Sequence, residues 1–317
     1  MATYNGAKYL QQQLDSFVMQ THLPDELVVC DDCSMDETIE ILEKFQKEAP
    51  FNVRIHQNSK ILGHTQNFNR AIEHCQGDII LVSDQDDVWL PKKIALVLAT
   101  FSENPDAGYV FSDAILVEDR LAPIGNLWAN INFTSFRYQN YVDGNQVEVM
   151  LSGGNIVYGN SLAFRASLCG IILPIECLSI AVTHDTWISM LLSSIGYQGV
   201  AISEALLLYR QHSQQVVGAG RRKSLKEKVL NVTESKQNLL LEKARDIRLI
   251  RNRVLKVPTK KVDLLDDYIA HLELRASLAD LTTREKMRSI YLEYKSGRYS
   301  KYSSALKSAI RDLIFSS

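Results

Sequence analysis

The chain has 317 residues, of which 46% are hydrophobic and 23% charged, the composition of a folded globular protein with a sizeable core. Its formal net charge of −2 gives no reason to expect a nucleic-acid partner. Five cysteines are too few for a disulfide scaffold, and their odd number favours a reducing compartment. No apolar run approaches the roughly 20 residues that span a bilayer, and the first residues do not resemble a signal peptide. We therefore expect a cytoplasmic enzyme or binding protein.

Short apolar runs alternate with helical patterns in the first part of the chain. Leu27–Cys30 and Ile79–Val82 predict strands that are buried on both faces, as in a parallel sheet, and Val53–Ile55 predicts a weaker strand. Helical periodicity marks the stretches 8–18, 36–45 and 65–75. This alternation predicts a doubly wound α/β sheet. Only Met1–Tyr4 is available for a first strand, so we expect that strand to be clipped and the sheet edge beside it to be weakened.

The alternation lapses after Asp113. We expect short strands at Gly153–Tyr158 and Ser161–Phe164, a helix at Asp185–Ser194, and two more strands at 199–202 and 206–210. From about residue 224 the pattern is helical and rich in Lys and Arg. The predicted organisation is an α/β domain over residues 1–220 and a helical extension over 221–317.

Acidic residues follow two of the predicted buried strands. Asp84, Asp86 and Asp87 come after Val82, at the strand end beyond which open α/β sheets bind ligands. Neighbouring carboxylates repel one another unless a cation compensates them, and oxygen ligands suit Mg²⁺ or Mn²⁺ on a diphosphate. A solvated acidic turn is the alternative. Asp32 follows the other strand and is predicted to face the same crevice, as an acceptor for a base or ribose or as part of a simple turn.

Three further segments place polar side chains at predicted element ends. Gly63–Asn69 opens a helix whose N–H groups favour a phosphate or a hydroxyl, although an ordinary capped helix explains it equally well. His184–Trp187 offers a carboxylate that can accept a hydroxyl proton and an indole that can support a sugar ring. A helix N-cap with a core tryptophan is the alternative there. His212 is a candidate metal or phosphate ligand, although a lone histidine is more often a surface or core residue.

Taken in order, these segments resemble the family 2 glycosyltransferases with the GT-A fold. The resemblance covers about Met1 to Val217 and rests on Met1–Gly6, Asp31–Thr38, Asp84–Asp87, His184–Trp187 and Tyr209–His212. Cys33 stands where the family usually has glycine. The helix opening at 63–69 is similar to that of rhamnosyltransferase-like members. The Gln-x-x-Arg-Trp signature of processive members is absent from the sequence, so we expect transfer of a single sugar. The resemblance implies a GT-A (Rossmann-like) mixed sheet flanked by helices, with a nucleotide-sugar half at about 1–113 and an acceptor half at about 114–220.

The resemblance also implies a role for each matching residue. The nucleotide-diphosphate sugar would be bound by Thr3, Tyr4, Asn5, Asp32, Asn67 and Asp84. A divalent cation, Mg²⁺ or Mn²⁺, would be bound by Asp86 and His212. The catalytic base would be Asp185, and the acceptor would be contacted by His184 and Trp187.

These roles imply an inverting, metal-dependent transfer, with dTDP-rhamnose as one candidate donor. The acceptor would be a hydroxyl of a saccharide or a lipid-linked glycan, as in polysaccharide or cell-envelope biosynthesis. Two alternatives stay open: a non-catalytic sugar-nucleotide-binding subunit and a sugar-phosphate nucleotidyltransferase. The basic helical extension is a candidate for peripheral contact with the inner face of the plasma membrane. Packing on the domain and a homo-oligomer contact are the competing interpretations.

Overall fold

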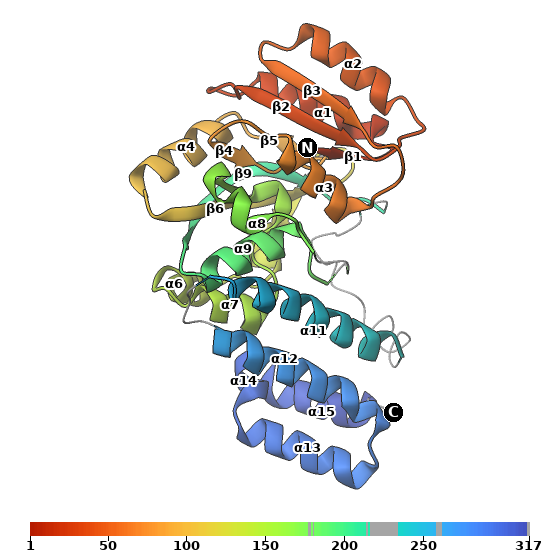
Figure 1. The fold of residues 1–317 in the computed structure, drawn as a ribbon, viewed down its shortest axis with the longest axis vertical. Coiled ribbons are helices and arrows are strands. Elements are labelled where there is room, and N and C mark those ends of the chain that lie inside the picture. Colours follow the sequence, from red (N-terminus) through yellow and green to blue (C-terminus); the bar gives the residue numbers. More distant parts are fainter. Residues whose placement is uncertain (177–178, 180, 214, 216–233, 258–261, 316–317) are drawn as a thin grey trace.

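The structure is a computed structural model that describes residues 1–176, 179, 181–213, 215, 234–257 and 262–315. An α/β part holds two sheets with helices packed around them, and a group of helices continues the molecule at one end (Figure 1). The strands are β1 (Ala2–Thr3), β2 (Glu26–Asp31), β3 (Asn52–Gln57), β4 (Ile79–Leu81), β5 (Val88–Trp89), β6 (Ala107–Val117), β7 (Pro123–Asn126), β8 (Ala163–Arg165) and β9 (Gln198–Arg210). The helices of this part are α1 (Ala7–Val18), α2 (Thr38–Glu48), α3 (His64–Glu73), α4 (Lys93–Glu103), α5 (Leu127–Asn130), α6 (Ser135–Val142), α7 (Gln146–Gly153), α8 (Cys169–Ile172) and α9 (His184–Ser194).

The first sheet is parallel, with the strand order β1-β2-β3. The apolar tetrad of β2 is buried throughout, as expected for a strand covered on both faces. Helix α1 buries Leu10, Leu14 and Phe17, which recur at the spacing of one helical face. β1 contains two residues, which agrees with the short first strand expected from the sequence.

The second sheet is mixed, with the order β4-β8-β6-β9-β5 and with β7 beside β6. β6 and β9 run parallel, whereas β4 pairs antiparallel with β8. The parallel environment predicted for the tetrad of β4 is therefore wrong, because burial on both faces does not fix the direction of the neighbouring strand. The mixed sheet flanked by helices that the resemblance implies is confirmed.

Two predictions in the second half of the α/β part are corrected. No strand forms at 154–158: α7 runs to Gly153 and ends in Gly154, whose φ of +82° turns the chain away. The two strands expected at 199–202 and 206–210 form the single strand β9. A register shift between Ile202 and Ala205 absorbs the polar residues that interrupt the apolar pattern.

The helical region consists of α11 (Glu234–Val254), α12 (Val262–Ser277), α13 (Thr283–Lys295), α14 (Arg298–Tyr302) and α15 (Ala305–Phe315). α11 contacts both α12 and α9, so this region packs directly on the α/β part (Figure 1). Ile247, Leu265 and Leu272 are fully or almost fully buried in these contacts. The domain boundary predicted near residue 220 lies outside the described residues. Among the helices described, none is long and apolar enough to span a bilayer.

Candidate active site

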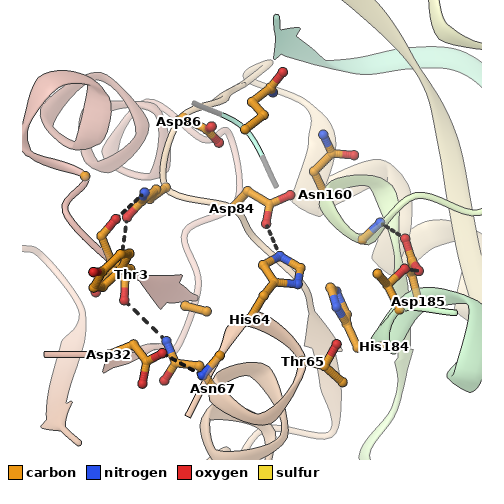
Figure 2. Close-up of a pocket in the computed structure, with 18 of the residues that line it drawn as sticks. Thr3, Asp32, His64, Thr65, Asn67, Asp84, Asp86, Asn160, His184 and Asp185 are labelled. Atoms are coloured by element: carbon orange, nitrogen blue, oxygen red, sulfur yellow. Dashed lines mark hydrogen bonds and ion pairs between the residues drawn. The ribbon is translucent and has the colours of Figure 1, made fainter. Parts of the chain in front are cut away.

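A cavity of about 790 Å³ opens at the carboxyl ends of β1, β2 and β4. Segments far apart in the sequence meet around it, and Figure 2 shows their side chains converging. Ten of the eleven site residues expected from the sequence line this cavity: Thr3, Tyr4, Asn5, Asp32, Asn67, Asp84, Asp86, His184, Asp185 and His212.

Asp32 follows β2 and holds the loop that leads into α3. Its Oδ1 accepts from the Leu62 backbone N–H at 2.7 Å and from the Asn58 amide at 2.8 Å, and its Oδ2 accepts from the Gly63 N–H at 2.8 Å. Gly63 has a φ of +83°, a conformation that glycine adopts without strain. A carboxylate has about four acceptor positions. With respect to the residues described by the structure, one position, on Oδ2, therefore remains for a ligand.

Asn67 in α3 ties the first two strands together. Its side-chain N–H groups donate to the Cys30 carbonyl at 2.9 Å and to the Thr3 carbonyl at 3.3 Å, while its Oδ1 accepts from Asn58 at 2.9 Å. The Thr3 hydroxyl donates in turn to Asp31 at 2.8 Å. These polar groups line the cavity but are engaged with the protein, so they fix its shape.

The turn after β1 is joined to the acidic loop after β4. Tyr4 and Gln85 exchange two hydrogen bonds: the Tyr4 N–H donates to the Gln85 side-chain oxygen at 2.9 Å, and the Gln85 amide donates to the Tyr4 carbonyl at 3.0 Å. Asn5, with a φ of +46°, accepts from the Met35 N–H at 2.8 Å. The Tyr4 ring is left half-exposed at the cavity.

Asp84 faces His64, the first residue of α3, with 3.8 Å between Oδ1 and Nε2 (Figure 2). Burial opposes the charged form of each group, but their interaction outweighs it. As a result, the pKa of Asp84 is lowered and the pKa of His64 is raised. The pair gives this side of the cavity both a donor and an acceptor.

Asp86 and His212 are in direct contact, with 2.7 Å between Oδ2 and Nε2. The His212 ring also lies against Tyr9, with 4.7 Å between ring centroids. Behind them, the buried Arg210 donates from Nε to the Asp86 carbonyl at 2.8 Å, and its guanidinium lies 4.5 Å from the Tyr9 ring centroid. Arg210 therefore fixes the backbone of the acidic loop from inside the core.

These two side chains fit a divalent cation. A carboxylate oxygen and an imidazole nitrogen already within 2.7 Å can converge on one ion in place of their mutual hydrogen bond. Within the described part of the chain, no cluster of three or more His, Cys, Asp or Glu side chains is arranged to hold a metal. Asp86 and His212 would therefore hold a cation that takes its other ligands from a diphosphate and water, as Mg²⁺ and Mn²⁺ commonly do.

Asp185 lies in the first turn of α9, on another wall of the cavity (Figure 2). Its Oδ2 accepts from the Gly159 N–H at 2.9 Å, and its Oδ1 accepts from the Thr186 N–H at 2.6 Å and from the Thr183 hydroxyl. The side chain is held in one orientation and still borders the cavity. A carboxylate placed in this way can accept a proton from a bound hydroxyl.

His184 is almost fully buried at the cavity, between His64 and Asp185. Its ring stacks on Phe68 with 4.0 Å between centroids, and neither ring nitrogen has a hydrogen-bond partner within the described part of the chain. Burial lowers the pKa of His184 to about 4, so the ring is neutral at neutral pH. A neutral imidazole with both nitrogens unpartnered has one donor and one acceptor to offer a ligand.

Trp187 is the exception among the expected site residues. It is fully buried and does not line the cavity, and its indole N–H donates to the Ile172 carbonyl at 2.9 Å. On α9 it lies two positions after Asp185, so it faces another side of the helix. The core position that the sequence left as an alternative is correct, and Trp187 is not an acceptor platform.

Sequence reasoning missed several residues that shape the site. Asn160 lines the cavity and donates to the buried Asp87 at 2.7 Å, and the buried Lys93 donates to the Asn160 carbonyl. Burial, followed by the charges of Asp86 and Asp84, raises the pKa of Asp87 well above its ordinary range. No local pattern marks Asn160, whereas the helix-opening segment at 63–69 did point to His64.

Comparison with known sequences gives one family match: the model described as "Glycosyl transferase family 2" matches residues 1–161. A dTDP-rhamnosyl transferase of Shigella flexneri is 38% identical over 98 residues, which cover 30% of this chain and 34% of that protein. An uncharacterised glycosyltransferase of Nostoc sp. is 30% identical over 109 residues, covering 34% of this chain and 33% of that protein. The chain therefore matches about a third of the length of these curated relatives.

Solved structures share the fold. S. aureus TarS 1–349 in complex with UDP-GlcNAc aligns with a TM-score of 0.54 at 18% identity, covering 98% of this chain and 80% of that chain. A mannosyltransferase of Pyrobaculum calidifontis in complex with GDP-Man and Mn²⁺ aligns with a TM-score of 0.51 at 15% identity, covering 99% and 84%. At these identities the likeness establishes the architecture alone.

Proposed function

Because the chain belongs to glycosyl transferase family 2, we propose that it transfers one sugar, with inversion, from a nucleotide-diphosphate sugar to an acceptor hydroxyl. The observation that carries this proposal is the convergence of Asp32, Asp84, Asp86 and Asp185 on one cavity of about 790 Å³. That volume is within the range of ligand sites, about 300–1,000 Å³. The four carboxylates come from three separate parts of the chain. This arrangement can contact the base, the diphosphate and the acceptor of such a reaction at the same time.

The donor base would meet Asp32 and the Tyr4 ring. The remaining acceptor position on Asp32 can accept from a base N–H, either the ring N–H of uracil, thymine or guanine or an exocyclic amine. The exposed Tyr4 ring offers a stacking surface. Asp84, oriented by His64, would accept from the ribose or from the transferred sugar.

The diphosphate would lie beside Asp86 and His212, which would hold the divalent cation. When bound, such a cation neutralises charge on the leaving diphosphate as a Lewis acid. Arg210 contributes indirectly, because its hydrogen bond to the Asp86 carbonyl keeps the acidic loop in place.

Asp185 would act as the general base. Its carboxylate takes the proton of the acceptor hydroxyl while that oxygen forms a bond to the anomeric carbon. The bond from this carbon to the diphosphate oxygen breaks, and its electron pair leaves with the nucleoside diphosphate. Asp185 and Asp86 lie on different walls of the cavity (Figure 2), which supports attack from the face opposite the leaving group. His184 would position the acceptor with its two unpartnered nitrogens.

The match with the Shigella rhamnosyl transferase favours dTDP-rhamnose among the candidate donors. The acceptor class that fits a family 2 enzyme of this kind is a saccharide or a lipid-linked glycan. We include this donor and this acceptor class in the proposed function.

The test is the product released from a panel of UDP-, dTDP-, GDP-, ADP- and CDP-sugars incubated with Mn²⁺ and candidate saccharide acceptors. Free nucleoside diphosphate from at least one donor class is expected, and the match with the Shigella rhamnosyl transferase makes the dTDP-sugars the first candidate. Pyrophosphate release would instead indicate nucleotidyl transfer. Donor binding without any turnover across the panel would favour a non-catalytic sugar-nucleotide-binding subunit.

Metal dependence is tested with Asp86→Ala. We expect loss of the Mn²⁺-dependent gain in nucleoside diphosphate affinity, measured by calorimetry with and without EDTA. Asp106→Asn, a change at an exposed aspartate outside the cavity lining, serves as the control and should titrate like the unmodified protein. An unchanged metal titration in Asp86→Ala would remove Asp86 as a ligand.

A further inference from the structure

The two ends of the molecule carry opposite charge. Residues 1–220 contain 12 Lys and Arg against 25 Asp and Glu, whereas residues 221–317 contain 23 against 12. The near-zero net charge of the whole chain conceals this division. The excess of positive charge continues to the last two long helices, α13 and α15, which contact each other at the end of the molecule opposite the first sheet (Figure 1).

Both helices leave an apolar stripe open to solvent. Met287, Tyr291 and Tyr294 recur at i, i+4 and i+7 on α13, and Leu306, Ile310 and Leu313 recur at the same spacing on α15. Each of the six side chains is 40–58% exposed. We call these six residues the apolar stripes. A single exposed leucine is ordinary, but an exposed apolar stripe on each of two helices that contact each other indicates an interaction surface.

Basic side chains border both stripes. At 100° per residue, Arg284 and Arg288 lie beside the stripe of α13, and Lys307 and Arg311 lie beside the stripe of α15. All four residues are exposed. The exposed surface of each helix therefore combines apolar and positively charged side chains.

The acidic residues of α13 and α15 are buried or engaged in a helix cap. Residues 283–315 contain three: Glu293 and Asp312 are buried, and Glu285 is engaged in the capping box with Thr282. Glu293 contacts His271 at 2.7 Å, and Asp312 contacts Arg275 at 2.6 Å. Asp312 pairs with Arg275 and Glu293 also lies 3.3 Å from Arg298, so Glu285 is the one exposed acid of this segment, against the exposed Arg284, Arg288, Lys307 and Arg311.

We propose that α13 and α15 dock this protein on the surface of an anionic phospholipid bilayer. The apolar stripes would enter the boundary between headgroups and acyl chains, and the flanking Arg and Lys would pair with lipid phosphates. A second copy of the same surface is a poor occupant, because two positive faces repel each other. The acidic α/β part would be repelled by the same bilayer, so the charge division also orients the molecule with its helical end toward the lipid. This inference does not depend on the chemistry proposed for the cavity.

The test is co-sedimentation of the full chain with vesicles of phosphatidylcholine alone and of phosphatidylcholine mixed with phosphatidylglycerol. We expect binding to the mixed vesicles that weakens as salt is added. Each basic residue near an anionic surface contributes about five-fold to partitioning. Arg288→Glu combined with Arg311→Glu should therefore reduce binding at least about 25-fold.

Two further variants separate the possible outcomes. Lys44→Glu with Lys47→Glu on α2 makes the same change in net charge at exposed residues in the other part of the molecule, and it should bind like the unmodified protein. Leu306→Ser with Ile310→Ser should weaken binding while the circular dichroism melt stays unchanged, because both side chains are exposed.

Equal loss in the α2 control would overturn the proposal, because net charge alone would then explain binding. Absence of binding to the mixed vesicles would also overturn it. Concentration-dependent self-association that Leu306→Ser with Ile310→Ser abolishes, without vesicle binding, would assign the surface to a second copy instead.

Discussion

The two walls of the cavity use their polar side chains in different ways. On the wall built by β1, β2 and α3, Asp32 and Asn67 hold backbone groups of neighbouring segments. On the wall that includes α9, neither nitrogen of His184 has a hydrogen-bond partner among the residues that the structure describes. Buried polar groups are normally paired. On the first wall most of the hydrogen-bonding capacity of Asp32 and Asn67 maintains the shape of the cavity, whereas both nitrogens of His184 are left for a ligand.

The largest effect that sharpens this contrast is expected from Asp185→Asn. The amide cannot accept the hydroxyl proton, so turnover should fall about 10²–10⁴-fold while the donor KM changes little. Steady-state release of nucleoside diphosphate measures both parameters. Asp106→Asn is the matched control. Turnover close to normal in Asp185→Asn would exclude Asp185 as the base.

A change on the first wall should act mainly on stability. Asn67→Ala removes the side-chain donor of the Cys30 carbonyl, whereas the Thr3 carbonyl still accepts from the Asp32 N–H at 2.9 Å, so the free energy of unfolding should fall by about 1–3 kcal/mol. Urea denaturation measures this loss, and Asn52→Ala, at an exposed position in β3, is the control. If Asn67→Ala abolished donor binding without changing stability, the distinction between the walls would fail.

The protonation of His184 offers a pH-dependent test of the second wall. Burial lowers its pKa from 6.5 to about 4, and the facing groups Asp185, His64 and Asp84 modify this only in part. Between about pH 6.5 and pH 4 the unfolded chain binds a proton that the folded chain does not. Folding stability should therefore decrease as pH falls through this window, by up to about 3 kcal/mol.

The comparison variant is His184→Gln, which removes the titrating group. As the pH falls from 6.5 to 4, the unmodified protein should lose unfolding free energy relative to this variant. A difference that stays constant over this range would show that His184 is not held neutral.

The smallest effect concerns the turn after β2. Cys33 has a φ of +64°, a conformation that costs a non-glycine residue about 1–2 kcal/mol. A β-branched residue tolerates this positive φ least, so Cys33→Val should lower the free energy of unfolding by about a further 1–2 kcal/mol, measured by thermal denaturation. Cys33→Gly should stay within about 1 kcal/mol of the unmodified protein, because relief of strain is offset by a more flexible unfolded chain. Equal melting of both variants would indicate that the turn is not constrained.

The sequence predicted the elements that bury continuous apolar runs, such as β2 and α9, and the ordered acidic motifs that meet in the cavity. Prediction failed where the structure depends on contacts with distant residues or on backbone geometry, which the local sequence pattern does not contain. Gly153–Tyr158 has strand-like residues, but the positive φ of Gly154 turns the chain instead. Trp187 was assigned by its proximity to Asp185 in sequence, whereas helical geometry rotates it into the core. The contacts of Asn160 depend on segments about 70 residues away, which no local pattern contains.

The reciprocal hydrogen bonds between Tyr4 and Gln85 cross a seam, because the two residues follow strands of different sheets. Asp32 and Asp86 lie on the two sides of the same seam. A ligand that binds both residues would connect the two sheets, and its binding free energy would stabilise their contact. Heating the liganded protein should consequently separate both sheets in a single, later transition.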